Sequence, residues 1–196
     1  LVNLSQLAFI VGPGLIAKHG FVKGTKALKV ATSLYFSGGK DNNKAWQGVY
    51  GLGGPDISFG TKNGVLRTKE NAAKGLIDQA DVLPDELIEL YTFGVDTSVF
   101  RRGLGYELTE IRRTDSKDFT GTRSKVESLL GWIFQNTERA NREITFLASY
   151  LVETNSSLLK GDKNEVSNLS GVAFNDKAAE IAREFTRDSH GTSLVE

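Results

Sequence analysis

Apolar residues recur at alternating spacings of four and three between Ser124 and Glu153, which is the pattern of an amphipathic helix. The apolar stripe consists of Val126, Leu130, Ile133, Thr137, Ala140, Ile144, Leu147 and Leu151. Ser124 and Glu127 have the spacing of a capping box, which marks a helix start. The sequence therefore predicts one long helix over about residues 124–153 that turns a continuous face toward a partner.

Opposite charges lie one helical turn apart on the rest of this predicted helix. Glu138 precedes Arg142 by four residues, and Arg139 precedes Glu143 by the same spacing. Such pairs stabilise an exposed helix by about 0.2–0.5 kcal/mol each. We interpret these charges as a solvated face that keeps the helix soluble.

The same apolar periodicity predicts shorter helices elsewhere. Four are expected: one capped by Thr25 and ended by Gly38, one over 70–80, one opened by Pro84 and ended by Gly94, and one started by Asp176 and ended by Gly191. Residues 1–17 carry no charge, but Gly12-Pro13-Gly14 interrupts them, and they are shorter than the roughly 20 residues that span a bilayer. We expect a buried helix and turn there; the alternative is a membrane-surface segment assisted by Lys18 and Lys23.

Eight of the 21 glycines lie in residues 38–64, so this stretch is predicted to be irregular with at most a short hairpin. Asn63-Gly64 is a favourable pair for the tight turn of such a hairpin. A phosphate-binding loop is disfavoured because Pro55 intervenes and no P-loop motif is present. We interpret the segment as a connector.

Together these patterns predict a mainly α protein, an irregular helical bundle built around the long helix. We divide the 196 residues into an apolar and basic helical segment with its glycine-rich connector, 1–64, and a helical packing domain, 65–196. A hydrophobic share of 39% and a charged share of 24% suit a folded globular chain. Because methionine is absent and Leu1 comes first, we expect a processed product or a segment of a larger chain.

The formal net charge is zero but is unevenly distributed. Residues 1–60 carry six lysines and two aspartates, whereas residues 61–100 carry four basic and seven acidic groups. We interpret the lysines of the first third as solvated, with a polyanion-facing surface as the alternative. The candidates for polyanion contact are Arg101, Arg102, Arg112, Arg113 and Arg123, since guanidinium groups suit phosphate oxygens. Interleaved acids make surface salt bridges the competing interpretation.

Catalytic chemistry finds little support in the sequence. There is no cysteine, and the two histidines are His19 and His190. Neighbours such as Asp188-Ser189-His190 cannot readily adopt triad geometry, so we expect His190 to complement the carbonyl end of the last helix. The remaining catalytic option is the carboxylate pair Glu107 and Glu110. We predict no catalytic, metal-binding or cofactor-binding residue and no enzyme activity.

Aromatic residues partly outside the stripe widen the apolar surface of the long helix beyond what one neighbouring helix covers. The candidate packing and assembly residues are Leu130, Trp132, Ile133, Phe134, Ile144, Phe146, Leu147, Tyr150 and Leu151. They predict association with other segments or other copies of the chain.

Three blocks in this order resemble a known family: GLIDQ at 75–79, TERANREITFLASY at 137–150 and DKAAEIAREFTRD at 176–188. They are similar to the helical C-proximal regions of very large virion-internal proteins of tailed bacteriophages, the ejection or pilot proteins of DNA transfer. The resemblance covers about residues 70–190, and none of its motifs carries a catalytic residue.

The resemblance implies a structural segment of a long polypeptide that is stored in the capsid interior and delivered to the host cell envelope to assist genome ejection. It implies as partners other segments or copies of a parent virion protein, with DNA or the host envelope as further contacts and no small-molecule substrate. Two alternatives stay open: a non-catalytic flank of a giant phage virion enzyme, such as a virion RNA polymerase or a peptidoglycan transglycosylase, and a soluble helical adaptor.

Overall fold

The structure is a computed structural model that describes residues 7–37, 58–62, 64–100, 122–155 and 171–190, with backbone alone for 36–37 and 122–137. Within these residues the chain is mainly helical, with six α-helices and one short antiparallel hairpin. The predicted fold class, an irregular helical bundle, is confirmed.

The elements follow one another in a simple order. They are the π-helical turn η1 (Leu7–Val11), α2 (Gly12–His19), α3 (Phe21–Ser37), β1 (Thr61–Lys62), β2 (Val65–Leu66), α5 (Lys69–Ala73), the 3-10 turn η3 (Gln79–Asp81), α6 (Asp85–Asp96), α8 (Thr122–Glu153) and α9 (Asp176–Ser189). The two strands pair with Thr61 opposite Leu66 and Lys62 opposite Val65, so the predicted hairpin at Asn63-Gly64 is confirmed.

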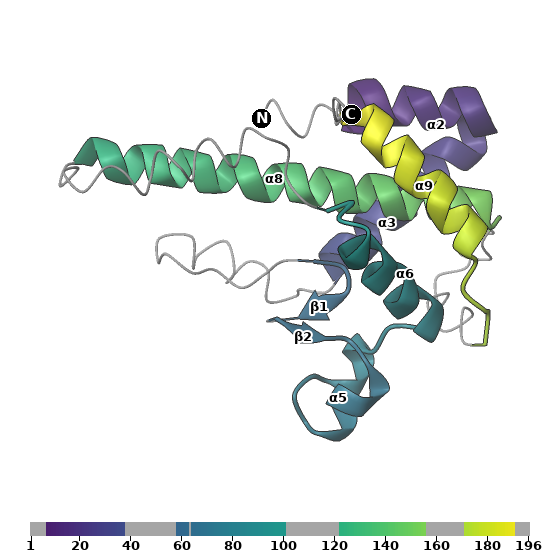
Figure 1. Ribbon diagram of the computed structural model, residues 1–196, viewed down its shortest axis with the longest axis horizontal. Coiled ribbons are helices and arrows are strands. Elements are labelled where there is room, and N and C mark those ends of the chain that lie inside the picture. The colour runs from purple at the N-terminus through teal and green to yellow at the C-terminus, as the bar shows by residue number, and fades with distance from the viewer. Residues whose placement is uncertain (1–6, 38–57, 63, 101–121, 156–170, 191–196) are drawn as a thin grey trace.

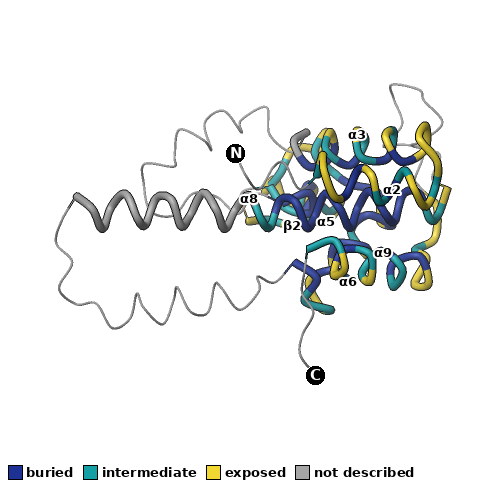
Figure 2. Tube along the Cα trace, turned by 90° about the horizontal axis from the view of Figure 1, so that it is seen from above, coloured by how far each residue is buried: buried dark blue, intermediate teal, exposed yellow. Residues whose placement is uncertain are grey.

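Helix α8 is the central helix of the described structure and confirms the prediction over 124–153. Helix α3 packs along one side of its C-terminal half, while α9 and α6 cover the opposite side (Figures 1 and 2). Every residue from 140 to 152 is buried. The stripe residues Ala140, Ile144, Leu147 and Leu151 are buried as predicted, but over residues 140–152 the helix is enclosed around its whole circumference rather than along one face.

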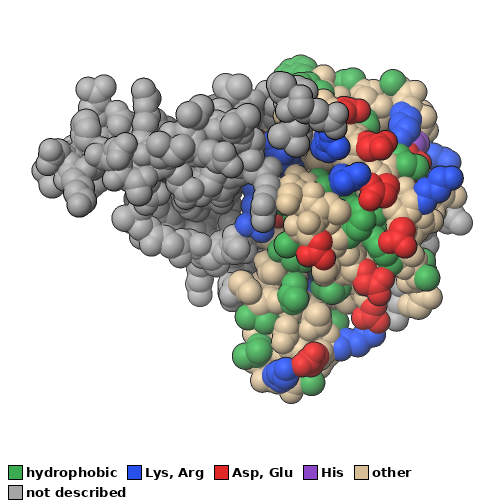
Figure 3. Space-filling model, viewed as in Figure 1, with side chains coloured by type: hydrophobic (Ala, Val, Ile, Leu, Met, Phe, Trp, Pro, Cys, Tyr) green, Lys and Arg blue, Asp and Glu red, His purple; other side chains and the backbone are tan. Residues whose placement is uncertain are grey.

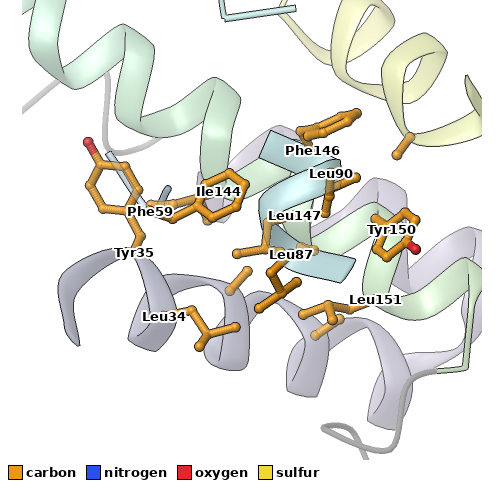
Figure 4. Close-up of a cluster of buried hydrophobic side chains, with 14 of the residues drawn as sticks. Leu34, Tyr35, Phe59, Leu87, Leu90, Ile144, Phe146, Leu147, Tyr150 and Leu151 are labelled. Carbon is orange, nitrogen blue, oxygen red and sulfur yellow. The ribbon is translucent and has the colours of Figure 1, made fainter. Parts of the chain in front are cut away.

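One hydrophobic core joins α2, α3, α6, α8 and α9. Leu34 of α3, Leu87 of α6 and Leu147 of α8 meet in its interior (Figure 4). Phe59, just before the hairpin, places its ring edge-on to Tyr91 at a centroid distance of 5.3 Å. Residues on both sides of the predicted division at 64 and 65 thus share the same core.

Two predictions near the N-terminus are wrong. Gly12-Pro13-Gly14 does not interrupt the helix, because it forms the first turn of α2, where proline has no intrahelical donor to lose. Thr25 does not start the next helix, which already begins at Phe21. The break comes instead at Gly20, whose φ of +87° is readily reached by glycine.

Two glycines also act differently from the prediction. The helix expected over 70–80 ends at Ala73, because Gly75 adopts φ +71° and the Leu76 amide donates to the Asn71 carbonyl, which closes the helix end. Gly94 does not end α6, which continues to Asp96. It lies under Phe100 instead, where a β-carbon would come within 2.3 Å of the ring.

Candidate functional site

The most deeply buried polar groups among the described residues lie on α8 or beside it. They include the charged side chains that we predicted to lie on a solvated face. Arg139 pairs with Glu143, and Arg142 pairs with Glu138, as their spacing predicts. Glu143 is 0% exposed and Arg142 is 3% exposed, however, so the interpretation as a solvated face is wrong. Identical spacing occurs on exposed and enclosed helices, and here the surrounding helices enclose the charges.

Glu143 is held by donors from two parts of the chain. Its Oε1 accepts from Arg139 Nε at 2.9 Å, and its Oε2 accepts from the Phe59 amide at 3.1 Å. The Ser58 hydroxyl also bonds to this carboxyl group. Burial raises the pKa of Glu143 above its ordinary value, while these three donors act in the opposite direction. The carboxyl group therefore ties α8 to the segment that precedes the hairpin.

Arg67 provides a second attachment for residues 58–60, the segment that precedes the hairpin. It is 5% exposed; its Nη1 donates to the Phe59 carbonyl at 3.0 Å, and its Nε donates to the Asp81 carbonyl at 2.7 Å. Burial lowers the pKa of Arg67, and Asp81 opposes this shift. The amide and the carbonyl of Phe59 are thus both bonded to buried charged side chains, Glu143 and Arg67, which hold its ring in the core.

Tyr150 forms a second polar connection, which joins three helices. Its hydroxyl donates to Glu86 Oε1 of α6 at 2.7 Å and accepts from the Asn175 amide at 3.1 Å. The Asn175 side chain in turn caps α9 by accepting from the Ala178 amide at 3.0 Å. Burial raises the pKa of both Tyr150 and Glu86. The raised pKa of Tyr150 keeps its hydroxyl protonated near neutral pH, so it can donate to Glu86 and hold α6 against α8.

His190 attaches the C-terminal end of α9 to α8. Its Nε2 lies 3.0 Å from Thr145 Oγ1, and that hydroxyl donates to the Asn141 carbonyl at 2.7 Å. The hydroxyl must therefore accept from His190, which places the proton on Nε2. Burial, together with the positive Arg142, lowers the pKa of His190 to about 4. The expectation that a charged His190 complements the end of its own helix is wrong, because the ring is neutral near pH 7.

The C-terminal end of α8 is attached to α2 by a more exposed contact. Lys18 Nζ lies 2.6 Å from Glu153 Oε1, and His19 Nε2 lies 3.4 Å from the same oxygen. Burial lowers the pKa of His19, and Glu153 acts in the opposite direction. The Lys18–Glu153 ion pair, unlike the Arg139–Glu143 pair, is accessible to salt.

The candidate assembly residues are placed as follows. Five of them, Ile144, Phe146, Leu147, Tyr150 and Leu151, are 0% exposed within this chain. Phe146, for example, lies against the rings of Phe93 and Phe100. These five therefore form the interior of the bundle and do not present a surface to a second copy.

The other candidates lie outside the described side chains. They are Leu130, Trp132, Ile133, Phe134 and Arg123 on α8, together with Arg101, Arg102, Arg112, Arg113, Glu107 and Glu110 in the segment before it.

Sequence reasoning missed the residues that hold the 58–60 segment and the tyrosine contact. Arg67 and Ser58 stand in no motif, and an acidic residue in the first turn of a helix, such as Glu86, is ordinarily explained by the helix dipole. Tyr150 was assigned to apolar packing, although a buried tyrosine usually finds a hydrogen-bond partner. That tendency is the one signal in the sequence that pointed toward a polar contact.

These contacts define a helical bundle whose elements are joined by buried hydrogen bonds and ion pairs. Among the described residues, no group of three or more His, Asp or Glu side chains is placed to hold a metal ion. In the same part of the chain, no helix is both long enough and apolar enough to cross a membrane. Comparisons with protein-family models, with curated proteins and with solved structures gave no match for this chain.

Proposed function

We propose that this chain is a non-catalytic structural segment of a large virion-internal protein of a tailed bacteriophage, which assists assembly and genome ejection into the host. The observation that carries the structural role is the use of the buried polar groups. Glu143 and Tyr150 each bond to a segment distant in sequence, and Arg67 bonds to the same residue, Phe59, that Glu143 holds, so these groups hold the bundle together. Polar side chains used in this way favour a scaffold over a reaction site.

The phage origin is supported by the resemblance of three sequence blocks, two of which are neighbours in the fold. The block at 137–150 lies in α8 and the block at 176–188 lies in α9, and these helices pack against each other. Thr145 with His190 and Tyr150 with Asn175 connect them. Two of the three blocks that resemble the phage family therefore pack against each other. This is expected of a family whose motifs serve packing rather than catalysis.

Mass spectrometry of purified particles from the source tests this proposal. Peptides from residues 140–190 should be present in DNA-filled particles and lost after ejection is triggered, whereas capsid-shell peptides should remain in both samples. Absence of these peptides from filled particles would overturn the phage assignment and favour a soluble adaptor. Their retention in emptied shells would overturn the role in ejection.

A further inference from the structure

The turn η1 and helices α2 and α3 present an outward surface rich in exposed apolar side chains. Phe9 is 79% exposed, Ile10 48%, Phe21 71% and Val22 74%, which makes them half of the large hydrophobic residues found exposed in the described structure. Apolar side chains line the upper edge of the molecule over η1 and α2 (Figure 3). Exposed apolar groups gathered on one part of a surface indicate a contact site.

Helical spacing explains why this surface faces outward. The inner face of α3 carries Gly24, Ala27, Ala31 and Leu34, which are all buried. A β-carbon at Gly24 would come within 2.9 Å of the α2 backbone, so α2 and α3 are in close contact there. The small inner residues let the two helices pack closely within the chain, whereas Phe21 and Val22 lie on the outer side.

The charged side chains that η1, α2 and α3 themselves carry are all of one sign, although Lys18 pairs with Glu153 of α8. The charged side chains of residues 7–37 are Lys18, Lys23, Lys26 and Lys29, with no acidic residue among them. Helix α6 has the opposite character, with four acidic residues and no basic one. Acidic side chains gather over α6, below the apolar edge, whereas acidic and basic side chains are mixed over α9 (Figure 3). The molecule therefore has a basic, apolar end that is distinct from its acidic face.

We propose that the outer face of η1, α2 and α3 binds peripherally to an anionic lipid bilayer. Phe9, Ile10, Phe21 and Val22 enter the boundary between headgroups and acyl chains, while the lysines contact anionic headgroups. Exposed apolar groups beside Lys23, Lys26 and Lys29 match the chemistry of such a surface. The acidic residues of α6 favour an orientation that points this helix away from the lipid.

Vesicle sedimentation with the 196-residue chain tests this proposal. Vesicles of phosphatidylcholine with about one-third phosphatidylglycerol should bind the chain at least roughly tenfold more tightly than phosphatidylcholine alone, and salt should weaken the binding. Replacing Phe9 and Phe21 together by serine should weaken binding by about tenfold or more. Replacing Lys23 and Lys29 together by glutamine should weaken vesicle binding by about thirtyfold, because each lysine contributes roughly fivefold and the two factors multiply.

Matched controls lie on other parts of the surface. Leu76→Ser with Val172→Ser removes two exposed apolar residues, and Lys69→Gln with Lys177→Gln removes two exposed lysines. Both control pairs should bind vesicles as the unmodified chain does. Circular dichroism verifies that each variant is folded, which we expect because every replaced side chain is exposed.

Equal binding to both kinds of vesicle, no binding to either, or equal losses in control and test variants would overturn the proposal. A dimer in solution that the Phe9 and Phe21 replacements abolish, without vesicle binding, would assign the surface to a second copy. Vesicle binding is measured on this chain alone, so its failure is distinguishable from failure of the particle experiment.

Discussion

The buried carboxyl group of Glu143 provides the sharpest test of the scaffold. Replacing it by leucine keeps a similar volume but removes the acceptor for Arg139 Nε and for the Phe59 amide, both at about 3 Å. Removing one partner of a buried ion pair costs about 3–5 kcal/mol, which includes the unpaired amide. For a chain of this size such a loss corresponds to a fall in Tm of roughly 10 °C.

The control is the same change in a pair of the same spacing on the surface. Glu70 pairs with Lys74 in α5 with its side chain 75% exposed, so Glu70→Leu should leave the urea midpoint of unfolding nearly unchanged. Urea unfolding at neutral pH, followed by circular dichroism, measures both variants. The comparison requires that the free energy of unfolding depends on urea concentration with the same slope in each.

Equal stability losses in the two variants would refute the reasoning, since Glu143 is buried and also bonded to the Phe59 amide, whereas Glu70 is exposed. A double variant gives a second test. Adding Arg139→Met to Glu143→Leu removes the cation left without its carboxylate, and should recover part of the lost stability. A further loss, equal to that of Arg139→Met alone, would show that the two side chains are energetically independent.

Three further changes test other contacts by the same unfolding measurement. Gly94→Ala should destabilise by about 1–3 kcal/mol because its β-carbon would meet the Phe100 ring, and a more stable variant would contradict this. Tyr150→Phe should cost about 1–3 kcal/mol by leaving the Glu86 carboxyl group without its donor, and an unchanged midpoint would argue against the contact. Because the pKa of His190 falls from 6.5 to about 4 on folding, the neutral ring stabilises the fold above pH 6.5, and about 3 kcal/mol should be lost as the pH falls toward 4. His190→Gln should lack this part of the acid sensitivity, and identical pH profiles would refute it.

The helices could be predicted because their periodicity is local. The alternating spacing that ends at Leu151 located α8 within two residues of its observed bounds, 122 and 153. Asn63-Gly64 likewise located the hairpin, since its turn chemistry depends on adjacent residues. Glycine was harder to interpret. Gly75 ends a helix whereas Gly94 lies inside one, and the difference depends on a ring that packs against Gly94 from outside α6.

The polar contacts could not be predicted for a related reason. The spacing of Arg139 and Glu143 indicates that they pair, but it contains no information on which elements cover them. Burial of Glu143 depends on a peptide 84 residues earlier, and that of Tyr150 depends on α6 and on the cap of α9. Such contacts are a property of tertiary packing, which a single sequence pattern does not encode.

The enclosure of α8 residues 140–152 also has a consequence for synthesis of the chain. Helices α3 and α6 leave the ribosome before this segment exists, so Leu87 and Leu90 of α6 have no α8 to pack against at that stage. At about 5–20 residues per second the interval lasts for seconds, long enough for chaperones or other nascent chains to bind there. A ribosome that stalls before residue 140 therefore leaves an aggregation-prone product. Helix α9 is made last and covers the remaining side of α8, so burial of the central helix is completed only near the end of this segment's synthesis.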